Sequence, residues 1–209
     1  MTPLHLLLLA LPLASAAHSD LSTPLGAPAA PRSWDSAYTL ASTALSELST
    51  ADKIALTTGT GVGFGPCSGN VKALPKINFP WLCLNDGPTA VRGADLVTVF
   101  PAGVTTGATW DKELMYLRSR AMGREARTKG VNVLLSPVAG ALGRAPDAGR
   151  GWEGFGSDPY LAGRGNAESV RGLQDEGVVA TVKHWIGNER ESTDAVCAGD
   201  TDCVRRGAL

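Results

Sequence analysis

Polar side chains follow three apolar segments that have the length and composition of buried strands. Asp86 follows the first segment, Arg150 lies in a long Gly- and Arg-rich loop after the second, and Lys183 and His184 lie near the end of the third. In parallel α/β proteins, ligands bind at the carboxyl ends of the strands, so we expect these side chains to converge. Carboxylate acceptors beside cationic donors suit a polyhydroxylated ligand such as a sugar.

Most of these residues also have an ordinary structural explanation. The run Asn85–Pro88 (NDGP) is typical of turns, and Arg150 alone fits a surface ion pair. Lys183 is harder to explain in this way, because its segment is otherwise apolar and burial of an unpaired ammonium is unfavourable. Lys183 therefore predicts a carboxylate or a ligand beside it. Glu153 is expected to pair with an arginine of its own loop. An apolar face for a sugar is expected from Trp152 or Trp185.

Hydrophobic periodicity predicts the elements that position these residues. Helices are expected over 34–48, 50–56, 111–129 and 158–176, and strands over 81–84, 131–135 and 178–185. The order of strand, helix, strand, helix, strand predicts βα units and a parallel sheet. A (β/α) barrel and an open doubly wound sheet both fit this order, and the position of the polar side chains favours the barrel.

The composition is that of a folded globular chain without an unusual charge. Of 209 residues, 44% are hydrophobic and 19% are charged, which is enough apolar surface to offset the entropy of ordering the backbone. The longest apolar runs fall short of the roughly 18 residues that a membrane span needs. For this reason a membrane is not an expected partner, and the net charge of −1 provides no basic field for binding a nucleic acid.

The amino terminus has the pattern of a secretory signal peptide over 1–17. An apolar stretch over 6–13 precedes small residues suited to signal peptidase, although the start of the chain lacks Lys and Arg. A buried strand or a short helix is the alternative. The Ser-, Pro- and Ala-rich stretch over 18–33 is expected to be an extended arm, and the protein is expected to be extracellular.

The cysteines are then expected to form disulfides, because secretion exposes them to an oxidising compartment. Four cysteines allow three connectivities, and local pairing of Cys67 with Cys83 and of Cys197 with Cys203 is favoured. A zinc site is not expected, since the sequence lacks a Cys-x-x-Cys motif and has two histidines after the signal peptide.

A series of short segments occurs in a fixed order between Leu40 and Glu189. They are 82–88 (LCLNDGP), 91–92 (VR), 100–103 (FPAG), 108–111 (ATWD), 130–133 (GVNV), 136–140 (SPVAG), 142–144 (LGR), 149–155 (GRGWEGF), 158–160 (DPY), 183–184 (KH) and 187–189 (GNE). Together they resemble the barrel signatures of fungal glycoside hydrolase family 3 β-glucosidases.

This resemblance implies an amino-terminal (β/α)8 barrel of the TIM type, followed by an α/β sandwich domain. It implies retaining hydrolysis that releases terminal β-D-glucose from β-glucosides such as cellobiose or cello-oligosaccharides, without a cofactor. The family's contacts to the glucose in the −1 subsite fall on Asp86, Arg92, Arg150, Lys183 and His184. In this reading Asp86 accepts from hydroxyls, while Arg150 and Lys183 donate to them. Cys67 and Cys83 resemble the family's first disulfide.

The sequence departs from the family at the catalytic carboxyls. Retaining hydrolysis needs two carboxyls about 5–5.5 Å apart. The family places its nucleophilic Asp in a Ser-Asp-Trp-type segment after the Lys-His strand, and its acid/base Glu in the second domain. No such segment follows His184, so both are expected beyond Leu209. Three carboxylates in the chain are not assigned as nucleophile, namely Asp147, Glu153 and Glu189.

The expected organisation is therefore an incomplete barrel domain over 34–191, the amino-terminal half of the family barrel, with a divergent tail over 192–209. A closed barrel usually takes about 250 residues. The leading hypothesis is the substrate-binding part of a secreted β-glucosidase that is inactive as this chain alone. The alternatives are a truncated, non-catalytic sugar-binding remnant, or a family member specific for β-xylosides or N-acetylglucosaminides.

Overall fold

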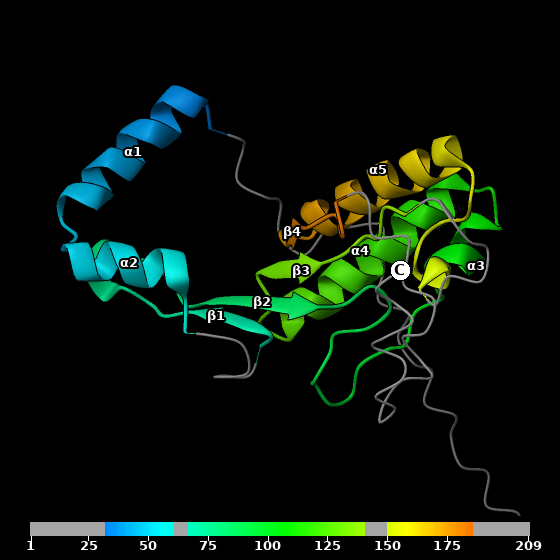
Figure 1. The fold of residues 1–209 in the computed structure, drawn as a ribbon, viewed down its shortest axis with the longest axis horizontal. Coiled ribbons are helices and arrows are strands. Elements are labelled where there is room, and N and C mark those ends of the chain that lie inside the picture. The colour runs from blue at the N-terminus through cyan, green and yellow to red at the C-terminus, as the bar shows by residue number, and fades with distance from the viewer. Residues whose placement is uncertain (1–31, 61–66, 141–149, 186–209) are drawn as a thin grey trace, which may run out of the picture.

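The computed structural model describes residues 32–60, 67–140 and 150–185 (Figure 1). The expectations for the signal peptide, for most of the extended arm, for Cys197 and Cys203 and for the carboxyl-terminal tail lie outside these residues. Within them, no helix is both long and apolar enough to cross a membrane.

A four-stranded sheet with the order β1-β2-β3-β4 forms the centre of the molecule. The strands are β1 (Gly69–Val71), β2 (Leu82–Asp86), β3 (Val133–Leu135) and β4 (Val179–Ala180). β1 is antiparallel to β2, whereas β2, β3 and β4 run parallel to one another. Because α4 and α5 connect the parallel strands, the predicted α/β class is confirmed.

The helices begin and end at the residues whose chemistry favours those positions. They are α1 (Trp34–Ser46), α2 (Thr50–Thr58), α3 (Gly103–Gly107), α4 (Lys112–Thr128) and α5 (Pro159–Asp175), with short 3-10 turns at η1 (Pro75–Ile77) and η2 (Gly151–Glu153). The side chains of Asp111 and Asp158 cap α4 and α5. Ser49 and Asp52 form a capping box on α2, which continues two residues beyond the predicted 50–56 and has Gly59 as its C-cap.

The core lies where α4 and α5 pack beside each other against the parallel strands (Figure 1). Its buried members include Met122 and Ala126 of α4, Leu134 of β3, Leu173 of α5, and Val178. The face of α4 that contacts α5 also includes a charged residue. Arg120 is 3% exposed and forms an ion pair with the fully buried Glu176. This cation and carboxylate compensate each other inside the helix interface.

Several predicted details differ from the structure. The expected strand over 178–185 is shortened to two residues, followed by an isolated bridge between Val138 and Lys183. β1 and α3 were not predicted, because their segments contain only three and five residues, which is too few to show a period. α1 forms as expected but buries none of its residues, and it projects away from the sheet (Figure 1).

Candidate functional site

Asp86 and Lys183 meet at the carboxyl end of the parallel strands, although 97 residues separate them in the chain. β2 ends at Asp86. The segment after β3 reaches Lys183 through the bridge at Val138 and through a hydrogen bond from the Lys183 amide to the Pro137 carbonyl. Lys183 Nζ lies 2.6 Å from Asp86 Oδ1. The side chain of Lys183 is only 12% exposed, so the carboxylate partner that its apolar surroundings predict is confirmed.

Arg92 approaches the same carboxylate from the other side. Its Nε lies 3.6 Å from Asp86 Oδ2, and its backbone amide donates to the Asp86 carbonyl, which closes the turn after β2. The Arg92 side chain is 58% exposed, which leaves it accessible to a ligand. Asp86 therefore lies between two cations that come from different parts of the chain.

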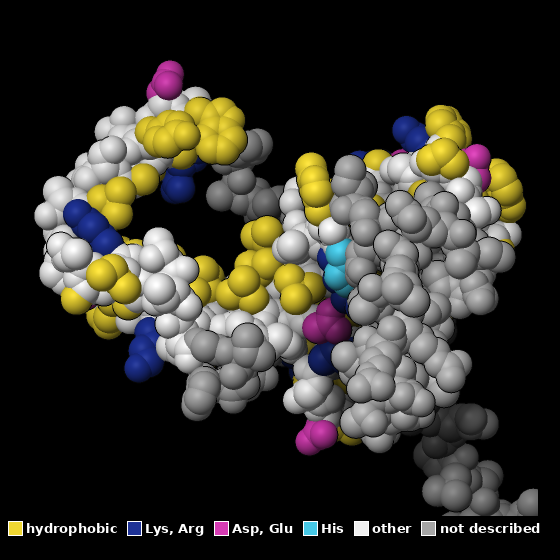
Figure 2. Space-filling view, in the orientation of Figure 1, with side chains coloured by type: hydrophobic (Ala, Val, Ile, Leu, Met, Phe, Trp, Pro, Cys, Tyr) yellow, Lys and Arg dark blue, Asp and Glu magenta, His cyan; other side chains and the backbone are white. Residues whose placement is uncertain are grey.

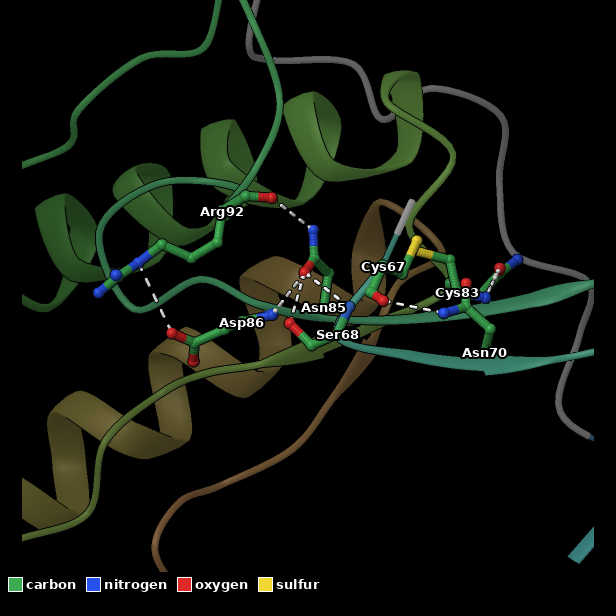
Figure 3. The surroundings of a disulfide bond; sticks show 8 residues. Cys67, Ser68, Asn70, Cys83, Asn85, Asp86 and Arg92 are labelled. Atoms are coloured by element: carbon green, nitrogen blue, oxygen red, sulfur yellow. Dashed lines mark hydrogen bonds and ion pairs between the residues drawn. A yellow bond between two sulfur atoms is a disulfide. The ribbon is translucent and has the colours of Figure 1, made fainter. Parts of the chain in front are cut away.

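Buried Asn85 fixes the backbone that carries Asp86 (Figure 3). Its Oδ1 accepts from the amide and hydroxyl of Ser68, and its Nδ2 donates to the Arg92 carbonyl at 2.8 Å. Next to Ser68, a disulfide joins Cys67, two residues before β1, to Cys83 of β2. The predicted Cys67–Cys83 pairing is thus present, and it anchors β2 three residues before Asp86.

Arg118 of α4 fixes the loop that follows Asp86. Its guanidinium donates to the carbonyls of Pro88 and Pro101, both at 2.8 Å. Burial lowers the pKa of Arg118 to about 10, because desolvation disfavours the charged guanidinium. The two bonds hold both ends of the loop against α4.

Arg150 and Glu153 form a bidentate ion pair at η2. Arg150 Nε lies 2.6 Å from Glu153 Oε1, and Arg150 Nη2 lies 3.1 Å from Glu153 Oε2. The expectation that Glu153 pairs with an arginine of its own loop is confirmed. Glu153 Oε2 also lies 3.8 Å from Lys183 Nζ, a contact that the sequence did not predict. Cations and carboxylates consequently alternate along the site, in the order Arg92, Asp86, Lys183, Glu153 and Arg150.

α3 supports the backbone beneath this ion pair. A Cβ atom on Gly103 would lie 2.0 Å from the Glu153 carbonyl oxygen, and one on Gly107 would lie 2.1 Å from the Phe155 carbonyl oxygen. Such separations are far below van der Waals contact, so only glycine permits this approach. Phe155 itself is 2% exposed, which anchors the far end of the segment in the core.

The remaining predicted site residues lie next to this cluster in the chain or outside the described residues. His184 directly follows Lys183 and is half-buried. Trp152 is 44% exposed and Trp185 is 77% exposed, so both rings are accessible to a ligand. Figure 2 shows basic, acidic and histidine side chains adjoining one another on one face. Three further polar residues of the loops lie outside the described residues, namely Arg144, Asp147 and Glu189.

The arrangement suits recognition of a neutral ligand with several hydroxyl groups. Charge-assisted donors and carboxylate acceptors alternate over a short distance, which matches a ligand whose every hydroxyl both donates and accepts. Among the residues that the structure describes, no group of three His, Cys, Asp or Glu side chains is arranged to bind a metal ion. From the sequence, Asn85 was interpreted as part of a turn. Its burial, which indicates a structural role for its side-chain amide, is evident only in the structure.

Comparisons with known proteins agree on one family. A family model described as "Glycosyl hydrolase family 3 N terminal domain" matches residues 80–204. The chain is 52% identical over 158 residues to the protein named probable beta-glucosidase F of Emericella nidulans, which covers 76% of this chain and 18% of that protein. It is 52% identical over 169 residues to probable beta-glucosidase L of the same organism, covering 81% and 23%.

Solved structures give the same result. The crystal structure of beta-D-glucoside glucohydrolase from Trichoderma reesei matches with a TM-score of 0.71 and 45% identity, covering 78% of this chain and 23% of that one. Beta-glucosidase 3B from Thermotoga neapolitana in complex with glucose matches with a TM-score of 0.65 and 32% identity, covering 72% and 23%. The chain therefore spans about a fifth of the length of the relatives that it matches.

Proposed function

Because the chain belongs to glycosyl hydrolase family 3 through its N-terminal domain, we propose that it supplies the glucose-binding part of a secreted β-glucosidase. The observation that carries the proposal is the 2.6 Å ion pair between Asp86 and Lys183. This pair joins the ends of two strand segments at the edge of the sheet where parallel α/β proteins bind ligands. A relative with 32% identity has been solved in complex with glucose.

We assign Asp86, Arg92, Arg150, Lys183 and His184 to binding of the terminal glucose in the −1 subsite. Asp86 accepts hydrogen bonds from sugar hydroxyls, while Arg150 and Lys183 donate charge-assisted ones. Such contacts raise the rate of hydrolysis where they strengthen in the transition state, because only that difference lowers the barrier. The two carboxyls of retaining hydrolysis are assigned to none of the residues that the structure describes.

The finer architecture is part of the same proposal. We assign β2, β3 and β4 to the first strands of an incomplete (β/α)8 barrel, with α4 and α5 as its first two outer helices. The barrel domain covers 34–191, the tail covers 192–209, and 1–17 act as a signal peptide. The parallel order of the three strands supports the barrel, and the Cys67–Cys83 disulfide supports secretion into an oxidising compartment.

The test is hydrolysis of an aryl β-glucoside and of cellobiose by the intact protein as its gene encodes it, secreted from a fungal host. We expect the protein to release glucose with retention of the anomeric configuration. The configuration of the released glucose is monitored by NMR. Aryl α-glucoside, β-xyloside and β-N-acetylglucosaminide serve as controls. A preference for the β-xyloside or the β-N-acetylglucosaminide would mean that the corresponding sugar, and not glucose, is the proposed substrate. Glucose binding without hydrolysis would favour the non-catalytic remnant, and neither binding nor hydrolysis by the folded protein would contradict the proposal.

A further inference from the structure

We propose that Glu153 is a positioning residue for the sugar-binding cations Arg150 and Lys183, an inference that rests on the function proposed above. Glu153 is a buried carboxylate, with 4% of its side chain exposed, and it lies between two cations on separate segments. A buried carboxylate is retained only where cations or hydrogen-bond donors compensate its desolvation. The cations that compensate Glu153 are Arg150 and Lys183, both of which we assign to binding of the glucose.

The bidentate contact fixes the plane of the Arg150 guanidinium. Two donors of one guanidinium, Nε and Nη2, bind the two oxygens of one carboxylate. Parallel bonds of this kind determine the orientation of the guanidinium as well as its distance. The directions of its other N–H groups are then set by Glu153, so a change at Glu153 redirects whatever Arg150 donates to a sugar.

The second contact links the loop to the strand. Lys183 Nζ lies 2.6 Å from Asp86 Oδ1 and 3.8 Å from Glu153 Oε2, so the ammonium lies between two carboxylates. Without the charge of Glu153, Lys183 would keep Asp86 as its nearest carboxylate, while Arg150 would lose its bidentate partner and the attraction that draws both cations to one carboxylate would be gone. Glu153 therefore sets the separation of the two donors, and it acts through them.

The test compares Glu153→Gln with Glu168→Gln in the intact protein. Glu168 is a matched control, because it is also buried and also pairs with two arginines, Arg164 and Arg171 of its own helix α5. We expect kcat/KM for an aryl β-glucoside to fall about 10- to 100-fold in Glu153→Gln, as for an active-site displacement on the order of 1 Å. Glu168→Gln is expected to leave kcat/KM unchanged while lowering the melting temperature.

A double-mutant cycle separates positioning from simple structural support. If Glu153 acts through Arg150, then Glu153→Gln has a much smaller effect on kcat/KM in an Arg150→Gln background than in the unaltered protein. Equal effects in both backgrounds would overturn the inference. Should Glu153→Gln fail to fold, Glu153→Asp keeps the charge and withdraws the carboxylate by one methylene. It is expected to lower kcat/KM with the melting temperature retained.

The outcomes for the inference and for the proposed function are distinguishable. An unaltered protein that hydrolyses the β-glucoside, together with a Glu153→Gln variant as active as Glu168→Gln, would overturn the positioning role alone. An unaltered, folded protein that neither hydrolyses the β-glucoside nor binds glucose would overturn the proposed function, and the positioning role with it.

Discussion

At the scale of single residues, Asp86 is the group on which the proposed glucose site depends most. It is the carboxylate that both Lys183 and Arg92 approach, and its side chain is 28% exposed, which leaves room for a hydroxyl. Its backbone is fixed from behind by buried Asn85. An acceptor held in one orientation before the ligand arrives loses little entropy on binding.

Replacement of Asp86 by Ala is expected to raise the barrier to β-glucoside hydrolysis by about 2–4 kcal/mol, or roughly 30- to 1,000-fold in kcat/KM. The variant loses an acceptor and leaves the Lys183 ammonium without its nearest carboxylate. The measurement is kcat/KM for an aryl β-glucoside. Asp95→Ala, which removes an exposed acid from the loop that follows Asp86, is the control. Equal kcat/KM values for the two variants would contradict the role of Asp86.

The sequence predicts part of this cluster for a clear physical reason. A lysine in an apolar strand requires a carboxylate or a ligand beside it, so a partner for Lys183 was predicted. A glutamate three residues from an arginine on a short turn pairs with that arginine, so the ion pair of Glu153 was predicted as well. The 3.8 Å approach of these two residues was not predicted, because it joins separate loops. The role of Asn85 was missed because the same residue types occur in ordinary turns.

At the scale of the elements, the contact between α4 and α5 determines how the two βα units pack. Tyr116 of α4 donates its hydroxyl to Asp175 of α5 at 2.7 Å, and burial together with this hydrogen bond raises the pKa of Tyr116. Gly172 allows the helices to approach, since a Cβ there would lie 2.6 Å from the Tyr116 carbonyl oxygen. Small residues at such crossings set the distance between helices.

Gly172→Ala is therefore expected to destabilise the protein by about 1–3 kcal/mol, because the added methyl overpacks the interface. Gly163 lies in the same helix, and a Cβ there would have nothing within 4 Å. Gly163→Ala is expected to stabilise the protein by about 0.5–1 kcal/mol through better helix propensity. Urea unfolding of both variants measures the difference. Equal shifts in the two midpoints would show that the helix crossing does not depend on Gly172.

Local signals predict the long elements well and the short ones poorly. Caps and periodicity place α2, α4 and α5 within two residues of their observed ends. β1 and α3, which contain three and five residues, carry too few side chains for a period. Both depend on partners distant in sequence: β1 pairs with β2, and α3 contacts the backbone around Glu153. No pattern within such a short segment indicates those partners.

At the scale of the whole molecule, the order of periodic segments predicts the α/β class and the parallel arrangement of β2, β3 and β4. It does not predict how far a sheet continues or closes, because closure depends on pairing between strands far apart in sequence. The large exposed side chains of α1, Trp34 at 79% and Tyr38 at 66%, illustrate the same limit. An amphipathic period indicates that a face is apolar and leaves the partner of that face unspecified.

The Cys67–Cys83 disulfide constrains the whole chain through its unfolded state. It closes a loop with a sequence separation of 16 residues, for which loss of the bond is expected to cost about 3 kcal/mol by the chain-entropy model. A Cys67→Ser/Cys83→Ser variant should therefore unfold at a lower temperature than the unaltered protein when no reductant is present. Differential scanning calorimetry measures the two transitions. An unchanged transition would mean that the bond adds nothing to stability.

The close approach of α3 to the segment over 153–155 limits how this site can be redesigned. A combinatorial library that randomises the loop around Glu153 to accept another sugar has to keep Gly103 and Gly107 constant, because any larger residue displaces the backbone beneath the binding groups. Exposed Val104 and Thr105 on the same short helix are open to change. Specificity in this fold is therefore more readily evolved through the loop side chains than through the helix that supports them.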